Sequence, residues 1–132
     1  MEKQAKVLLI DDDPDFVEAT KIVLESRPFQ VIIALDGDEG LTKAREEKPD
    51  VIILDIIMPT KDGFAVCEEL KKEPELADIP VLLLTSLSQR IGETSISVTQ
   101  GLTTEAEDYV DKPVSPDELI RRVERLLEKV GQ

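Results

Sequence analysis

The sequence contains no histidine and a single cysteine, and both shortages limit the chemistry open to the chain. Without histidine, the usual general base and the imidazole ligand of metal sites are missing. The lone cysteine, Cys67, cannot form an internal disulfide, and its place among apolar residues at helical spacing predicts a small buried hydrophobe. Acid–base chemistry or metal binding must therefore use other groups.

Aromatic residues are also scarce, with three Phe, one Tyr and no Trp, which argues against a platform on which bases or a flavin would stack. Basic residues are outnumbered, at 16 Lys and Arg against 29 Asp and Glu, for a net charge of −13. Such a surface repels nucleic-acid phosphates, so we expect no direct nucleic-acid binding. It suits a divalent cation or a basic protein partner, although solubility alone explains much of the charge.

Apolar runs of membrane-spanning length are missing, and the first residues lack the apolar segment of a signal peptide. We therefore expect a cytoplasmic protein with no membrane insertion. The 132 residues, 41% of them apolar, suffice for one core. We expect a single domain over residues 1–132, with a core of about 5–130 and no room for an attached output domain.

The stretch from Asp50 to Gly63 organises the rest of the chain. Val51 to Leu54 is a continuous apolar run, typical of a strand buried on both faces of a parallel sheet. Asp55 follows it, and because a charge within such a strand is costly, we expect this carboxylate at the strand's C-terminal end. Open parallel sheets bind their ligands at these ends.

Strand and helix signals alternate along most of the chain. Predicted strands are Lys6–Ile10, Phe29–Leu35, Val51–Leu54, Val81–Leu84 and Asp108–Asp111. Capping residues at Asp13, Asp36 and Ser115 open three of the helices. The pattern predicts an α/β fold: a flavodoxin-like, doubly wound, five-stranded parallel sheet of order 2-1-3-4-5 with helices on both faces. A fourth helix within Leu87–Thr104 is expected to be short or irregular, because helix propensity there is poor.

Polar residues at the predicted strand ends would meet at one edge of this sheet. They are Asp11, Asp12, Asp55, Thr85 and Lys112. Carboxylates brought together repel one another and have raised pKa values unless a cation joins them. An oxygen-only ligand set favours a hard ion such as Mg²⁺, with Mn²⁺ as an alternative. With such an ion, the threonine hydroxyl and the lysine could stabilise charge on a phosphoryl group reaching Asp55.

These motifs resemble the receiver domain of two-component response regulators, the CheY-like family, over nearly the whole chain. Its marks are Asp-Asp after the first strand, Asp-x-x-Met-Pro with Asp-Gly after the third, Thr-Ser after the fourth, and Tyr-x-x-Lys-Pro around the fifth. The chain departs from the family pattern at Lys61, where a hydrophobic residue is usual, and at Glu105-Ala106. It is also a few residues longer than usual between Thr85 and Tyr109.

The resemblance implies that Asp55 accepts a phosphoryl group from a phosphohistidine on a histidine kinase or histidine phosphotransfer protein. Asp12 and Asp55 would ligate Mg²⁺ directly, Asp11 directly or through water, and the backbone carbonyl of Ile57 would complete the protein ligands. Lys112 would contact the phosphoryl oxygens. The family consists of signalling modules that promote their own phosphorylation and dephosphorylation, not of enzymes acting on a separate substrate.

The resemblance also implies a switch formed by Thr85 and Tyr109. The hydroxyl would move toward the phosphate and the ring would turn inward, changing the face made by the fourth helix, fifth strand and fifth helix. A downstream protein would bind that face.

Two alternatives remain from the sequence. A phosphatase of the haloacid dehalogenase type would carry its phosphoryl group on Asp11, with Asp13 two residues on, although Asp15 stands where that motif has Thr or Val. Asp13 otherwise serves as a helix cap. A pseudo-receiver would keep the fold as an interaction module without the chemistry, and the intact set of acidic residues and lysine argues against it.

Overall fold

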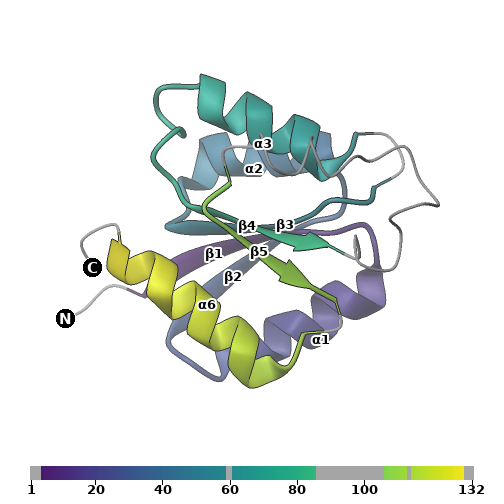
Figure 1. The fold of residues 1–132 in the computed structure, drawn as a ribbon, viewed down its shortest axis with the longest axis vertical. Helices are drawn as coiled ribbons and strands as arrows, with labels where there is room; N and C mark the ends of the chain where they lie inside the picture. The colour runs from purple at the N-terminus through teal and green to yellow at the C-terminus, as the bar shows by residue number, and fades with distance from the viewer. Residues whose placement is uncertain (1–3, 59–60, 86–105, 113, 130–132) are drawn as a thin grey trace.

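The chain folds as a parallel sheet of five strands covered by helices on both faces (Figure 1). This computed structural model describes residues 4–58, 61–85, 106–112 and 114–129. Its elements are β1 (Ala5–Ile10), α1 (Pro14–Glu25), β2 (Phe29–Ala34), α2 (Gly37–Glu47), β3 (Val51–Asp55), α3 (Gly63–Lys72), β4 (Val81–Thr85), β5 (Asp108–Asp111) and α6 (Pro116–Lys129). Neighbouring strands run in the order β2-β1-β3-β4-β5, all parallel. The predicted fold and strand order are confirmed, while the helix expected within Leu87–Thr104 lies outside the described residues.

Two apolar layers fill the space between the sheet and its helices. In Figure 1, α2 and α3 lie on one side of the sheet, and α1 and α6 on the other. Side chains alternate along each strand, so on β1 Val7 and Leu9 join the layer beneath α1 and α6, whereas Leu8 and Ile10 join the layer beneath α2 and α3. All five residues of β3 are buried, as its uninterrupted apolar run predicted.

Side chains at the predicted caps start the helices. Asp13 accepts the N–H groups of Asp15 and Phe16, and Asp36 accepts that of Glu39. The predicted capping box of α2 is modified, because the Glu39 carboxylate accepts the N–H of Leu35, one residue before the cap. Each cap satisfies helix N–H groups that have no partner within the helix.

The buried face of α1 differs from the sequence prediction. The helical spacing predicts Phe16, Ala19, Thr20, Val23 and Leu24 on the core face. The structure buries Val17, Thr20 and Leu24, leaves Ala19 exposed, and places Phe16 and Val23 half-buried beside α6. Thr20 and Leu24 are therefore buried as predicted and Val17 replaces Ala19 on the buried face, while Phe16 and Val23 lie toward α6.

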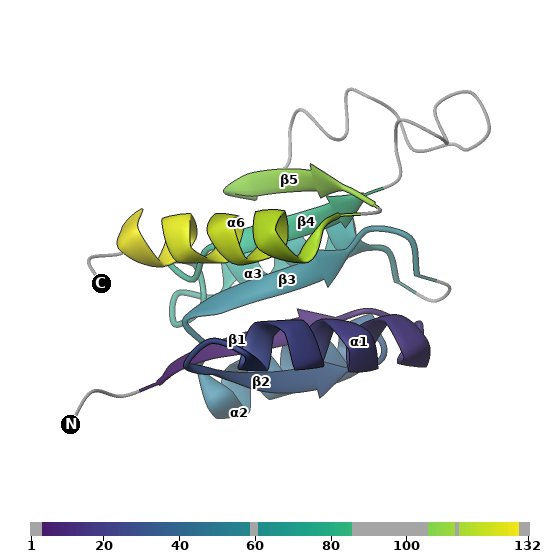
Figure 2. The same ribbon diagram turned by 90° about the horizontal axis from the view of Figure 1, so that it is seen from below.

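The parallel arrangement brings the C-terminal ends of all strands to one edge. Figure 2 shows the arrowheads of the strands pointing the same way, with α6 and α1 side by side across the sheet. Ile10 pairs with Leu54 in register, so the residues that follow β1 lie beside the end of β3. Asp55 in turn pairs with Leu84 of β4.

Candidate functional site

Three carboxylates meet at the C-terminal edge of the sheet. Asp11 follows β1 and is 1% exposed, Asp55 ends β3 and is 5% exposed, and Asp12 is exposed to solvent. One oxygen from each lies within 4.8 Å of the others. The adjacent strands thus assemble the acidic cluster that the sequence predicted.

Backbone hydrogen bonds fix the positions of these carboxylates. The N–H of Asp11 donates to the Ala34 carbonyl at 3.1 Å, and the N–H of Ile56 donates to the Leu84 carbonyl at 3.0 Å. The Oδ1 of Asp11 accepts the N–H of Asp13 at 3.0 Å. The main chain of the sheet therefore holds Asp11 and the end of β3 at Asp55 in place.

Lys112 supplies positive charge from the segment after β5. Its Nζ lies 2.9 Å from Oδ2 of Asp11 and 3.4 Å from Oδ1 of Asp55. The same Nζ lies 4.3 Å from the centre of the Phe16 ring. The lysine therefore bridges the two buried carboxylates and contacts α1.

Burial and neighbouring charge raise the pKa of Asp55 to about 6. Burial is the largest cause and the Asp11 charge adds to it, while Lys112 acts in the opposite direction. For Lys112, burial alone would lower the pKa, but the hydrogen bond to Asp11 and the charges of Asp55 and Asp11 outweigh it, so the pKa is raised. One lysine does not balance three clustered carboxylates, and a divalent cation fits their oxygen-only chemistry.

The loop after Asp55 is packed closely against the end of β3. Gly63 donates its N–H to the Ile56 carbonyl at 2.8 Å, and a Cβ at Gly63 would lie 2.7 Å from the Ile56 Cα. Asp62 caps α3 by accepting the N–H of Ala65 at 2.9 Å. The Asp-Gly pair therefore turns the chain where a side chain has no room. Ile57, the predicted carbonyl ligand, lies in this loop and is half-buried.

Lys61 ties this loop to both helices on its side of the sheet. Its Nζ forms ion pairs with Asp38 of α2 at 3.2 Å and with Glu69 of α3 at 2.6 Å. These pairs explain how a lysine is accommodated where the family usually has a hydrophobic residue.

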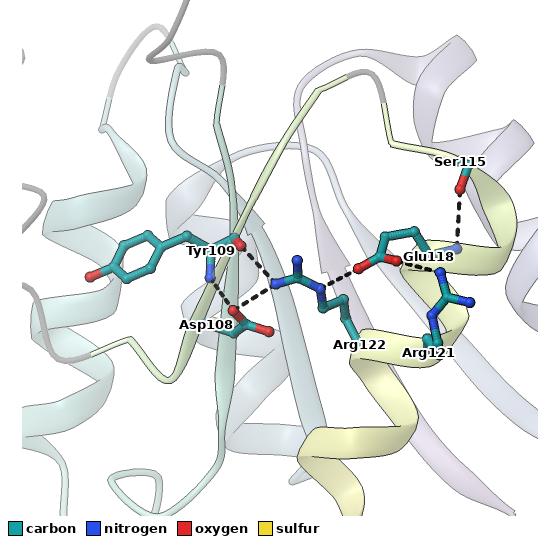
Figure 3. Close-up of polar contacts among 6 residues, drawn as sticks. All are labelled: Asp108, Tyr109, Ser115, Glu118, Arg121 and Arg122. Atoms are coloured by element: carbon teal, nitrogen blue, oxygen red, sulfur yellow. Dashed lines mark hydrogen bonds and ion pairs between the residues drawn. The ribbon is translucent and has the colours of Figure 1, made fainter.

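The predicted switch residues lie on β4 and β5. The backbone of Thr85 ends β4 and pairs with Asp111, while its side chain lies outside the part of the chain that the structure describes. Tyr109, on β5, is 36% exposed, and in Figure 3 its ring points away from α6. Burial, and to a smaller extent the neighbouring Cys67, raises the pKa of Tyr109. Cys67 itself is buried, as predicted.

An arginine that the sequence analysis did not single out joins β5 to α6. Arg122 donates to the Asp108 carboxylate at 2.9 Å, to the Tyr109 carbonyl at 3.1 Å and to the Glu118 carboxylate at 2.5 Å (Figure 3). Arg121 also pairs with Glu118. The two arginines lower the pKa of Glu118 to about 2. In the sequence, the only sign of this network was the spacing of Glu118 and Arg122 by one helical turn.

Comparison with known proteins identifies the family. The model of the response regulator receiver domain matches residues 7–124. This chain belongs to the response regulator receiver family. It is 34% identical to the signal receiver domain of a histidine kinase from Syntrophus aciditrophicus, with a TM-score of 0.87 over 97% of this chain and 93% of that one. A chemotaxis protein CheY4 structure from Vibrio cholerae matches at 30% identity and a TM-score of 0.81, over 94% of this chain and 99% of that one.

Curated relatives of this receiver chain are longer proteins. It is 40% identical, over 96% of its length, to the DNA-binding dual master transcriptional regulator RpaA of Synechocystis, and covers 51% of that protein. It is 37% identical, over 94% of its length, to the alkaline phosphatase synthesis transcriptional regulatory protein PhoP of Bacillus subtilis, and covers 49% of it. The chain thus spans about half the length of these relatives. The name of RpaA describes that protein as DNA-binding. The comparison therefore does not support the expectation that nucleic acid is excluded as a partner.

The structure brings some of the predicted site residues together and leaves others outside the cluster. Asp11, Asp12, Asp55 and Lys112 lie together, although their roles stay predictions. Asp13 caps α1 with its side chain, which leaves the haloacid dehalogenase alternative without its second carboxylate in the cluster. Among the described residues, no helix is long and apolar enough to cross a bilayer. The expectation of a cytoplasmic location stays a prediction.

Proposed function

We propose that this receiver takes a phosphoryl group onto Asp55 from a phosphohistidine on a histidine kinase or histidine phosphotransfer protein. The observation that carries the proposal is the placement of Asp55: a nearly buried carboxylate at a strand end, with two carboxylates within 4.8 Å and a lysine at 3.4 Å. Residues 1–132 contain no histidine, so the phosphohistidine donor lies outside them.

In the transfer, an Asp55 oxygen forms a bond to phosphorus as the phosphorus–nitrogen bond of the donor breaks. The electron pair of that bond stays on the imidazole nitrogen, which takes up a proton. Asp55 must be ionised to react, and with a pKa of about 6 it is mostly ionised at neutral pH. Lys112 stabilises negative charge on the phosphoryl oxygens.

Mg²⁺, with Mn²⁺ as a substitute, is the proposed cofactor. Asp12 and Asp55 would hold it, with Asp11 binding directly or through water and the Ile57 carbonyl completing the protein ligands. When bound, the ion would neutralise negative charge on the carboxylates and on the phosphoryl group. The close approach of three carboxylate oxygens supports this assignment.

Phosphorylation is proposed to act through Thr85 and Tyr109 on a downstream protein partner. Tyr109 is 36% exposed on β5, so an inward turn of its ring would change the surface that a partner meets. Arg122 holds the Tyr109 backbone to α6, so a change at β5 would be transmitted to that helix. We propose that this receiver domain is a signalling module that promotes its own phosphorylation and dephosphorylation.

Incubation with acetyl phosphate or phosphoramidate, with and without Mg²⁺, tests the proposal by intact-protein mass. We expect one phosphoryl group on the wild type with Mg²⁺, and none on Asp55→Asn. Asp78→Asn is the matched control, because it makes the same change at an exposed residue just before β4, at the opposite edge of the sheet.

Peptide mapping after the reaction separates the alternatives. A phosphoryl group on Asp11 would support the haloacid dehalogenase type of enzyme. A wild type that takes up no phosphoryl group from any donor would leave the pseudo-receiver as the better description.

A further inference from the structure

Phe16 places an aromatic ring against the lysine of the site. The Lys112 Nζ lies 4.3 Å from the ring centre, while its two carboxylate partners, Asp11 and Asp55, lie at 2.9 Å and 3.4 Å. A cation at this distance from a ring face is attracted by the negative potential of the π system. We propose that Phe16 is a positioning residue for phosphoryl transfer, its ring holding the Lys112 ammonium beside the phospho-accepting carboxylate. This inference rests on the proposed function.

A closed series of contacts fixes the ring. The Asp11 Oδ1 accepts the N–H of Asp13 at 3.0 Å, and the Asp13 Oδ1 accepts the N–H of Phe16 at 3.3 Å. The Phe16 ring contacts Lys112, and the Lys112 Nζ donates to the Asp11 Oδ2 at 2.9 Å. The cap that starts α1 therefore also sets where the ring meets the lysine.

A ring suits this place because it attracts the ammonium without accepting a conventional hydrogen bond. Lysine has three N–H donors on a flexible stem. When a phosphoryl group joins Asp55, these donors must turn toward new oxygens. The ring keeps the Nζ in place during that change and leaves its donors available. The Lys112 side chain is 26% exposed, so without the ring it would have solvent-facing conformers open to it.

Phe16 also packs in an apolar groove between α1 and α6, and this packing must be separated from its effect on the lysine. Thr20, Val23, Val114 and Leu119 line the groove with it. A leucine at position 16 would keep the apolar contacts but has no π system. A tyrosine would keep the ring. Val23→Ala removes apolar contacts from the same helix and groove at a residue with no ring.

The test compares Phe16→Leu, Phe16→Tyr and Val23→Ala with the wild type, each first shown to melt cooperatively. We expect Phe16→Leu to slow phosphorylation by phosphoramidate at saturating Mg²⁺ by roughly threefold to tenfold, the size of a partly buried cation–π contact. Phe16→Tyr should react near the wild-type rate, and Val23→Ala should not be slowed.

NMR of the Lys112 ε-methylene, assigned by its loss in Lys112→Met, gives a readout that needs neither Mg²⁺ nor phosphorylation. A ring-current shift should be present in the wild type and Phe16→Tyr and absent in Phe16→Leu. If the wild type is phosphorylated but Phe16→Leu reacts equally fast, or Phe16→Tyr is as slow as Phe16→Leu, the positioning role is overturned and the proposed function stands. If the wild type takes up no phosphoryl group, the proposed function fails and this role with it.

Discussion

Asp55 carries a charge in surroundings that disfavour it, and its ionisation should therefore affect stability. Burial and the Asp11 charge raise its pKa from 3.8 to about 6, so the folded protein binds the proton more tightly than the unfolded chain does. This contribution to stability is fully present below about pH 4 and is lost as the pH rises through about 6. Without metal, Asp55→Asn should then be more stable than the wild type by about 2 kcal/mol at pH 8.

Urea unfolding in the presence of a chelator, at pH 4.5 and pH 8, measures this difference. The gain of Asp55→Asn should be small at the lower pH, because the wild-type carboxyl is protonated there. Asp78→Asn should give nearly the same small change at both, because Asp78 is exposed. An Asp55→Asn variant that is less stable than the wild type at pH 8 would contradict the argument.

At the scale of the elements, a buried lysine links the end of α3 to the starts of β4 and β5. The Lys71 side chain is 5% exposed and its Nζ donates to the carbonyls of Ala77 and Ile79 and to Glu107. Glu107 also accepts the N–H of Val81 at 2.7 Å. Lys71→Met would remove this donor from the two carbonyls and from Glu107, which would keep the N–H of Val81, so we expect a loss of about 1 to 3 kcal/mol in the free energy of unfolding.

Lys72→Met is the matched control for this prediction, since the neighbouring lysine is exposed and the charge change is the same. It should alter the free energy of unfolding by less than about 0.5 kcal/mol. Amide exchange should also quicken at Tyr109 and Val110 of β5 in Lys71→Met while β1 and β2 stay protected. If the two variants lose the same free energy of unfolding, the loss comes from the change in net charge and not from the Lys71 contacts.

Helices and strands could be predicted where the sequence pattern that specifies them lies within the element or at its end. The apolar run before Asp55 predicted a buried central strand, and Asp13-Pro14 predicted the start of α1; both are confirmed. The acidic cluster followed from strand order, because parallel strands end at one edge. The contacts of Phe16 with Lys112 and of Lys71 with Glu107 were not predictable, since each joins side chains from distant parts of the chain whose meeting depends on packing.

For α1, the predicted burial of Thr20 and Leu24 is confirmed, but the spacing missed Val17 and placed the exposed Ala19 on the core face. A helix that packs against both a sheet and another helix has two apolar edges, and the spacing of its apolar residues does not distinguish them. For the same reason, the sequence predicted Phe16 in the core. The residue is half-buried and its ring contacts Lys112 of the acidic site.

The whole molecule carries a net charge of −13, and this overall repulsion must be separated from repulsion within the site. Any salt screens charges spread over a surface and so stabilises an acidic protein slightly. Asp11, Asp12 and Asp55 are different, because they are fixed within 4.8 Å of one another and two of them are buried. Lys112 offsets part of that local repulsion, and an ion bound between the three carboxylates would relieve more of it.

Mg²⁺ should therefore raise the melting temperature beyond the effect of NaCl at equal ionic strength. A ligand that binds only the folded state stabilises it by RT ln(1 + [L]/Kd), about 2.7 kcal/mol at a hundred times Kd, or several degrees for a domain of this size. Asp12→Asn should lose most of this extra rise, because Asp12 is the exposed member of the cluster and its substitution leaves the buried pair with Lys112 intact. Asp78→Asn should keep it. Equal shifts with Mg²⁺ and NaCl in the wild type would mean that the cations screen the molecule as a whole and that the cluster holds no ion.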